Sequence, residues 1–230
     1  MTEGSTIWVL ITLLAYLGSS QLYRLSGHHP LLLPAFVGSA VVISILSLTG
    51  TDHAHYLVAV DPLEFWLGPA TVALAVPLYG QWRRLMSLWR PVLMALLVGS
   101  LVAGGSALLV AAVFKGSPGL MVALAPKSTT MPVATALCRH FGGAAPIAAL
   151  AVALTGTFGA VLFDLVRRFF RVPLNDEVTG FTLGLGAHAI GTARAVRISE
   201  VAGAFAALAM GLNGLMTALW MPLLGWVLGW

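Results

Sequence analysis

The sequence predicts an all-α integral membrane protein with about six to eight transmembrane segments. Of its 230 residues, 59% are hydrophobic and only 9% are charged, and the mean hydropathy is +0.94. A soluble domain has roughly 45–50% apolar and 25% charged residues. Because a bilayer core about 30 Å thick needs about 20 apolar residues per helix, this length leaves almost nothing for a soluble part. We therefore expect a single membrane domain over residues 1–230.

Four of the apolar runs have the composition of continuous membrane helices. They are rich in Leu, Val, Ile and Ala and have no charge in their middles. These runs cover about residues 7–23, 31–50, 91–114 and 146–166. We assign residues 7–50 and 91–114 to a scaffold of helices.

Three other runs are interrupted by residues that weaken helices. They cover about residues 64–82, 119–138 and 178–193, and the last contains four glycines within GFTLGLGAHAIGTARAV. The prolines that we expect to break helices are Pro69, Pro77, Pro126 and Pro132. Proline removes a backbone donor, and glycine weakens a helix by about 1 kcal/mol. Broken backbone at membrane depth is tolerated only where it is buried in protein or lines a wet cavity, so these runs predict discontinuous or re-entrant elements at a site.

The chain also contains two weak internal repeats. Residues 67–77 align with 124–134 at a spacing of 57, and residues 148–162 align with 206–220 at a spacing of 58 with seven identities. The repeated unit reads as a broken element followed by a long helix, over about 119–171 and 178–230. Internal repeats that hold discontinuous helices around a midplane site are the common plan of secondary transporters.

The charges predict topology and exclude a soluble role. A net charge of +4 would suggest nucleic acid for a soluble chain, but here the arginines sit in short loops and report orientation. If the runs at 119–138 and 178–193 are re-entrant, nine arginines collect on one side, which is then cytoplasmic, and Lys115 and Arg139 lie on the other. We expect no nucleic-acid partner. Cys138 is the single cysteine, so no internal disulfide can form, and the acidic start around Glu3 predicts no cleaved leader.

Lys127 is the most informative polar residue of the chain. An isolated lysine at the bilayer centre costs about 3 kcal/mol on insertion scales. It is followed by Ser128, Thr129 and Thr130, which makes four consecutive hydrogen-bonding side chains between two prolines. Such a patch suits an anion better than lipid. The alternative is that Lys127 lies near the interface and extends its ammonium to water.

The last broken run supplies further candidates. His188 and Thr192 are four residues apart and would share one face of a helix, whereas glycines such as Gly191 favour an unwound backbone whose N–H groups could bind a carboxylate. His188 could equally be a packing histidine, and Arg194 could be a topogenic arginine. Asn213 precedes a glycine in the last long run, and it could line the site or bond helix to helix.

No pattern in the sequence indicates catalysis. The chain has no nucleophile elbow, P-loop or zinc pair, and His53 and His55 lack a third metal ligand at useful spacing. An intramembrane enzyme needs paired acid and base groups, and only His188 is available. We therefore expect no enzyme activity, no metal and no cofactor, with H⁺ or Na⁺ as candidate coupling ions and His188 as a candidate proton carrier.

Four stretches carry a resemblance to a known family. They are LGPATVALAVPLY, PKSTTMPVA, AHAIGTARA and GAFAALAMGLNGLMTAL, and in this order and spacing they resemble the LrgB/CidB-like membrane proteins of bacteria. The plant relative of that family is the plastid glycolate/glycerate translocator. The likeness covers about residues 25–225. It departs from the family at Ala187, where a serine is usual, and at Met131, where a small or hydroxyl residue is usual.

The resemblance implies transport of small hydroxy or keto acids such as glycolate, glycerate, lactate or pyruvate. It also implies a multi-pass protein of the bacterial cytoplasmic (inner) membrane. Carried over by motif, the site residues are Lys127, Ser128, Thr129, Thr130, Pro132, His188, Gly191, Thr192, Arg194 and Asn213. Older accounts of the family describe instead a holin-like system, in which a small LrgA/CidA-like partner and this kind of protein modulate murein hydrolase activity and lysis.

Two functions from different classes follow. The first is a secondary carrier for small monocarboxylates that works by alternating access, with Lys127 and Arg194 facing the carboxylate. The second is a holin-like or antiholin-like protein. A large pore should show polar stripes along several helices, and the continuous runs show none, so we prefer the carrier. By analogy with carriers of this architecture we expect a homodimer.

Overall fold

The computed structural model describes residues 3–27, 32, 34–73, 75–170 and 174–228, and the regular secondary structure within these ranges is all helix, without strands. Four of these helices are long and apolar enough to cross a membrane by length and composition. They cover Ser5–Leu25, Trp89–Val113, Ala145–Arg167 and Glu200–Trp226. The all-α membrane class is thus confirmed, whereas this count does not confirm six to eight segments.

Two features of the described residues explain why four helices, and not six to eight, qualify as membrane spans. The apolar stretch Phe36–Thr49 is shorter than a span, and the run at 119–138 is divided into two short helices. Pro69 does not break its run where we predicted, because the helix continues through Pro62 and Pro69 to Ala73. Neighbouring groups can satisfy the backbone that a proline frees in a membrane helix.

The chain divides into two compact units, residues 1–74 and 75–230. The predicted single membrane domain therefore stays a prediction. Three predicted boundaries lie outside the described residues. They are the ends of the domain at residues 1 and 230 and the unit boundary at residue 171.

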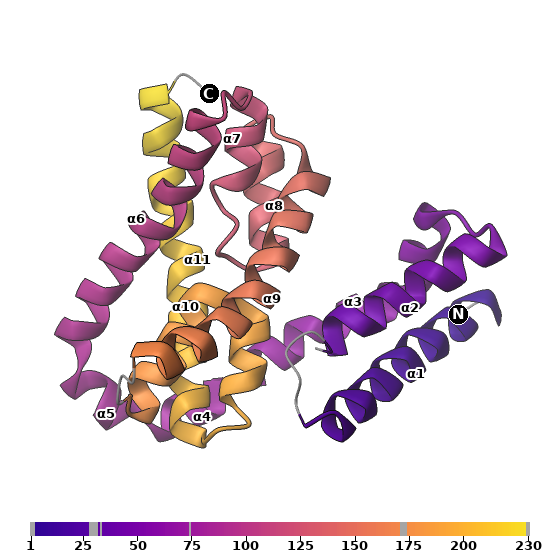
Figure 1. Cartoon of the computed structure of the whole chain (residues 1–230), viewed down its shortest axis with the longest axis horizontal. Helices are drawn as coiled ribbons and strands as arrows, with labels where there is room; N and C mark the ends of the chain where they lie inside the picture. Colours follow the sequence, from indigo (N-terminus) through magenta and orange to yellow (C-terminus); the bar gives the residue numbers. More distant parts are fainter. Residues whose placement is uncertain (1–2, 28–31, 33, 74, 171–173, 229–230) are drawn as a thin grey trace. The chain divides into compact units, whose positions relative to one another are not determined.

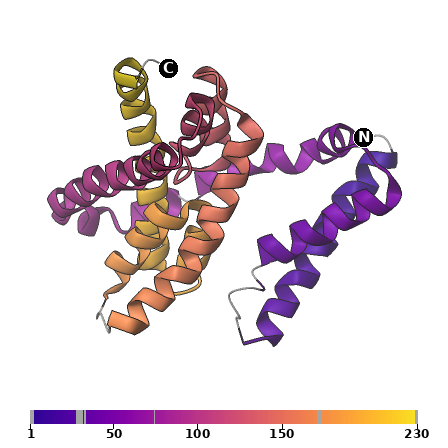
Figure 2. The same ribbon diagram turned by 45° about the horizontal axis from the view of Figure 1, so that its top comes forward.

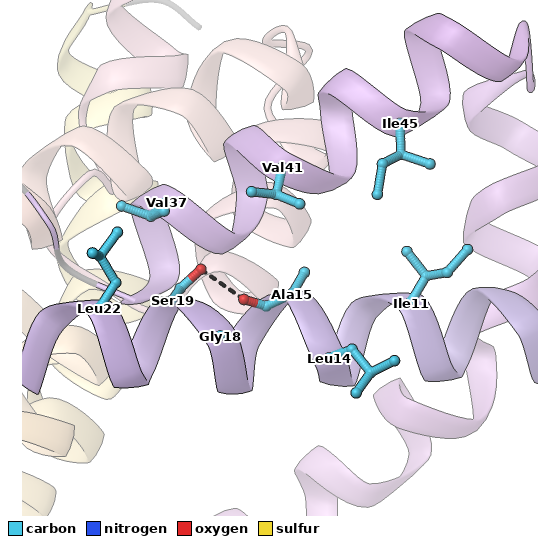
Figure 3. Close-up of a pocket in the computed structure, with 9 residues that line it drawn as sticks. All are labelled: Ile11, Leu14, Ala15, Gly18, Ser19, Leu22, Val37, Val41 and Ile45. Atoms are coloured by element: carbon cyan, nitrogen blue, oxygen red, sulfur yellow. Dashed lines mark hydrogen bonds between the residues drawn. The ribbon is translucent and has the colours of Figure 1, made fainter.

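The first unit is a set of three helices, α1 (Glu3–Leu25), α2 (Pro34–Thr49) and α3 (His53–Ala73). Trp8 of α1 lies edge-on to Tyr56 of α3, with ring centroids 5.7 Å apart. The α1 and α2 helices flank an apolar groove (Figure 3), in which the Ser19 hydroxyl donates to its own helix at Ala15 O, 2.6 Å away. The groove therefore presents almost only aliphatic side chains.

The second unit contains eight helices among the described residues. They are α4 (Ala75–Gly80), α5 (Trp82–Ser87), α6 (Trp89–Val113), α7 (Pro118–Leu124), α8 (Met131–His140), α9 (Ala145–Phe170), α10 (Asp176–Ala195) and α11 (Glu200–Leu228). In Figures 1 and 2, α11 extends through this unit, with α7 and α8 near its C-terminal end and α10 near its beginning. Side-chain packing agrees, since Trp220 and Met221 pack with Val122 of α7.

Small residues allow α10 and α11 to approach closely. A Cβ atom added to Gly180 would lie 2.1 Å from Ala202 O, and one added to Gly184 would lie 2.1 Å from Ala206 O. These two pairs have the spacing of the small-xxx-small motif, which lets membrane helices pack backbone to backbone. The predicted weakness of this glycine-rich run is thus offset by close helix packing.

Candidate functional site

The run at 119–138 forms a hairpin of two short helices. Ser117 caps α7 by accepting from Leu120 N at 3.3 Å, with Pro118 in the first turn, as expected for a helix start. Val122 of α7 and Cys138 of α8 both lie against Gly143. The C-terminal part of α8 therefore lies beside α7. The connection between them, residues 125–130, forms the tip of this first hairpin.

The tip of the first hairpin is held by its own polar groups. Both the backbone N–H and the hydroxyl of Thr129 donate to Pro126 O, at 3.0 and 2.8 Å. Thr130 occupies the N-cap position of α8 but its side chain makes no capping bond. The first turn of α8, which includes the exposed Pro132, therefore presents the positive end of a helix at the tip without a cap from Thr130.

Lys127 lies at this tip and is partly buried. Its ammonium donates to Ser128 Oγ at 3.4 Å. Neither of the ion pairs found among the described residues involves Lys127. A cation that is partly withdrawn from water without a carboxylate partner is costly, and no carboxylate of the described residues balances the charge of Lys127.

Asn213 of α11 joins the tip to the long helix. Asn213 and Thr129 are each 1% exposed, and Ser128 is 6% exposed, so the contact is inside the protein. The Asn213 Nδ2 group donates to Ser128 O at 2.8 Å across 85 residues of sequence. Its carboxamide oxygen, Oδ1, has no hydrogen-bond partner among the described residues.

The run at 178–193 forms a second hairpin inside α10. Asn175 caps this helix by accepting from Val178 N at 3.0 Å. The backbone leaves helical geometry at His188, where φ is 38° and ψ is −124°. A Cβ atom on Gly191 would lie 2.1 Å from Leu183 O, which requires the chain to fold back after His188. The predicted role of Gly191 as a substrate contact thus competes with a packing role in this fold.

His188 is buried at the tip of the second hairpin. Its Nε2 atom lies 3.0 Å from Val152 O of α9, and the absence of a side chain at Gly156 makes room for the ring. Thr192 donates to His188 O at 2.8 Å, so its hydroxyl stabilises the reversal.

Arg194 has a different environment from Lys127. Its guanidinium donates to Ala160 O at 2.7 Å and forms an ion pair with Asp164. This pairing connects the second leg of the hairpin to α9. Sequence reasoning missed Asp164, although a lone acid near the end of an apolar run is a signal for a buried partner.

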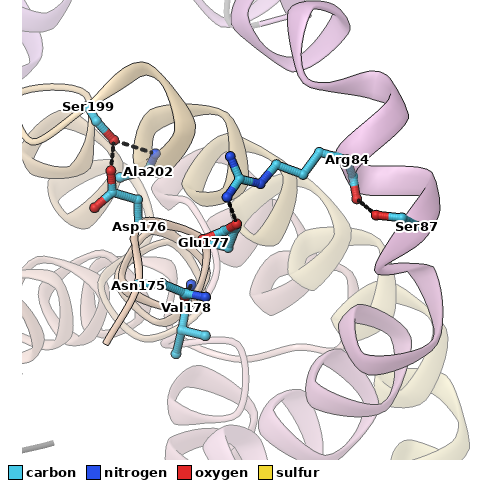
Figure 4. Close-up of polar contacts among 8 residues, drawn as sticks. All are labelled: Arg84, Ser87, Asn175, Asp176, Glu177, Val178, Ser199 and Ala202. Atoms are coloured by element: carbon cyan, nitrogen blue, oxygen red, sulfur yellow. Dashed lines mark hydrogen bonds and ion pairs between the residues drawn. The ribbon is translucent and has the colours of Figure 1, made fainter. Parts of the chain in front are cut away.

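The base of the second hairpin is anchored by polar contacts that the sequence did not reveal (Figure 4). Asp176 accepts from Ser199 Oγ at 2.7 Å, and Ser199 caps α11 by accepting from Ala202 N at 3.1 Å. Glu177 is 7% exposed and pairs with Arg84 of α5. These contacts connect α10 to both α5 and α11.

The structure therefore separates the predicted site residues into groups. Lys127, Ser128, Thr129, Thr130 and Asn213 lie together at the first tip, whereas His188 and Thr192 lie at the second tip. Arg194 is engaged by α9. A tip that combines an ammonium, hydroxyls and a helix N-terminus can bind a small anion.

Comparison with known proteins identifies the family. The LrgB-like family model matches residues 12–227. Two similar proteins from Bacillus subtilis (strain 168) are YwbG, 33% identical over 218 residues, and YxaC, 30% identical over 221 residues. These alignments cover 94% and 96% of this chain, respectively, and 95% of each relative.

A third relative has a name that describes a role. The antiholin-like protein LrgB of Bacillus subtilis (strain 168) is 28% identical over 221 residues, which cover 96% of this chain and 95% of that protein. No solved structure shows significant similarity to the chain. Since the family model covers most of the sequence, as the four motifs predicted, the chain belongs to the LrgB-like family of membrane proteins.

Proposed function

We propose that this protein is a secondary carrier for small monocarboxylates of the glycolate, glycerate, lactate or pyruvate class, working by alternating access. The observation that carries the proposal is the partly buried Lys127 ammonium, whose bond among the described residues is to Ser128 Oγ at 3.4 Å. The carboxylate of the substrate would complete the charge balance there. The hydroxyls of Ser128 and Thr130 and the first N–H groups of α8 would bind its oxygens.

The two hairpins support a carrier plan. Each broken element is followed by one long helix, α9 after the first hairpin and α11 after the second. If both hairpins are re-entrant and α9 crosses the membrane once, they enter from opposite sides and their tips meet near the middle. This is the inverted repeat plan of secondary transporters, and it would allow one unit to move against the other around Lys127.

In this proposal Arg194 has a structural role. Its pairing with Asp164 leaves Lys127 as the principal cation for the substrate. His188 and Thr192 would maintain the second tip, and H⁺ or Na⁺ would serve as coupling ion. We further propose a homodimer in the bacterial cytoplasmic membrane, with neither enzyme activity nor a cofactor.

Uptake into proteoliposomes tests the carrier. We expect wild-type protein to accumulate labelled lactate, pyruvate or glycolate, measured at two pH values with and without sodium to identify the coupling ion. Lys127→Ala should reduce uptake by at least about 100-fold, because the charge that binds the carboxylate is lost. Lys115→Asn, which removes an exposed lysine at a backbone position with φ of 53°, is the matched control. Equal uptake by both variants would remove Lys127 from the mechanism.

A second candidate function is an antiholin-like role, and the relatives' names favour it over the carrier. The protein would then modulate murein hydrolase activity and cell lysis, with an LrgA/CidA-like membrane partner. Its test is the lysis rate of a bacterial strain that lacks the gene and carries wild type or Lys127→Ala. Modulation of lysis that persists in Lys127→Ala, together with absent uptake, would favour this second function.

A further inference from the structure

The carboxamide of Asn213 is an incompletely satisfied polar group deep inside the protein. The residue is 1% exposed, and its Oδ1 atom is a buried acceptor that receives no hydrogen bond from the described residues. Buried polar atoms of proteins are nearly always hydrogen-bonded, so each exception needs an explanation. A donor supplied by a bound molecule is one such explanation.

Rotating the amide cannot satisfy this oxygen. Asn213 Nδ2 lies 2.8 Å from Ser128 O, and a carbonyl oxygen can only accept. Exchanging Nδ2 and Oδ1 would place two acceptors against each other, so the contact with Ser128 fixes which way the amide points. The Oδ1 atom is therefore a hydrogen-bond acceptor of fixed orientation, and only a donor group can satisfy it.

The acceptor belongs to the same polar cluster as Lys127. Ser128 connects the two residues, because its backbone oxygen binds Asn213 and its hydroxyl accepts from the Lys127 ammonium at 3.4 Å. Gly214, next to Asn213, faces the first turn of α8 at Val133. The ammonium that would bind a carboxylate and the carboxamide that carries the unpaired oxygen are thus both held by the same residue of the tip.

We propose that Asn213 Oδ1 is a specificity-determining hydrogen-bond acceptor. It favours 2-hydroxy carboxylates, such as lactate, over the corresponding 2-keto acids, such as pyruvate. This inference rests on the proposed carrier function. A hydroxyl donates to the amide oxygen, whereas a keto oxygen repels it and a methylene leaves it unpaired. A site built to bond a hydroxyl discriminates strongly against analogues that lack it.

The test compares three acids of similar size, namely lactate, pyruvate and propionate, as inhibitors of labelled lactate uptake in proteoliposomes of the full chain. We expect wild-type protein to be inhibited by lactate at concentrations at least about tenfold lower than by pyruvate or propionate. This measurement uses no variant, so it does not depend on whether a mutant folds. Equal inhibition by lactate and pyruvate would overturn the specificity proposal and leave the carrier intact.

Two variants of α11 test whether Asn213 causes the preference for lactate over pyruvate. Asn213→Leu should bring the lactate-to-pyruvate ratio to within about threefold of unity, because the acceptor is gone. Thr217→Val, which removes a buried hydroxyl one turn further along α11, should leave the ratio unchanged. A ratio that Asn213→Leu leaves at its wild-type value would overturn the role of Asn213. If none of the three acids is taken up or inhibits uptake of any labelled monocarboxylate, the carrier proposal fails, and this one with it.

Discussion

The two hairpins of residues 75–230 each carry a basic residue that we predicted to contact substrate, Lys127 at the first tip and Arg194 in the last turn of α10, but the two cations have different surroundings. Lys127 donates to a neighbouring hydroxyl and belongs to neither ion pair of the described residues. Arg194 is bound by Asp164 and by Ala160 O of α9. The first cation therefore has capacity to bind a ligand, while the second is used in holding the fold.

The hairpins also differ in how they pack. The second packs its glycines against the backbone of α11, with added Cβ atoms at 2.1 Å from carbonyl oxygens. The first is connected to α11 by side chains, through the Asn213 hydrogen bond and the packing of Trp220 and Met221 with Val122. A backbone-to-backbone contact tolerates no added atom, whereas side chains can change rotamer while the backbones stay apart. This comparison indicates that the first hairpin is the better candidate for rearrangement around a substrate.

The largest expected effect comes from the close contact of the second hairpin. Gly184→Leu would place its Cβ atom 2.1 Å from Ala206 O and should prevent α10 from packing on α11. We expect loss of the monodisperse peak when the protein is purified in detergent. Gly186→Leu, two residues later with no neighbouring atom within 4 Å of its Cβ position, is the control and should purify normally. Similar behaviour of the two variants would refute the close approach.

The next effect separates the two cations by their contribution to stability. Arg194→Ala should lower the free energy of unfolding by about 1–3 kcal/mol, because Asp164 keeps its charge in a partly buried place without its partner. Thermal unfolding in detergent measures this, with Lys127→Ala as the matched comparison that should lose little stability. The double variant Arg194→Ala/Asp164→Ala should lose less stability than the sum of the single changes. Strict additivity would show that the pair contributes nothing.

A smaller effect tests the placement of His188. A Cβ atom on Gly156 would lie 2.4 Å from the His188 ring, so Gly156→Ala should destabilise the protein by about 1–2 kcal/mol through overpacking. Replacing the ring as well, in Gly156→Ala/His188→Ala, should relieve that clash. Gly211→Ala, at an open position of α11, is expected to be neutral or slightly stabilising. No difference between the two alanine variants in thermal unfolding would contradict the proposed fit.

The smallest effect concerns the anchor at the base of the second hairpin. Ser199→Ala removes the bonds to Asp176 and to Ala202 N and should cost about 1 kcal/mol, as for other helix N-caps. Ser106→Ala is the control, because the hydrogen bond of its hydroxyl to the described residues is to Ala103 O of its own helix. Equal thermal midpoints for the two variants would show that the cap does not hold α10 to α11.

The sequence by itself determined the membrane class, and it predicted that the runs at 119–138 and 178–193 are interrupted, although not that the second break falls at His188. A hydropathy of +0.94 excludes a soluble domain, because apolar side chains on that scale need lipid or protein around them. The break at 125–130 follows from local chemistry, since prolines and hydroxyl residues act on their own backbone. For the same reason the tip residues Lys127 to Thr130 could be predicted as one polar group.

Only the tertiary structure decided what each polar residue touches. The partner of Arg194 lies 30 residues away, that of His188 lies 36 away and that of Ser128 lies 85 away. No local pattern specifies such partners, because they depend on which helices pack together and at what level. The same reason explains why Pro69 could be taken for a break: whether a proline ends a membrane helix depends on the groups that neighbouring chain segments offer to its backbone.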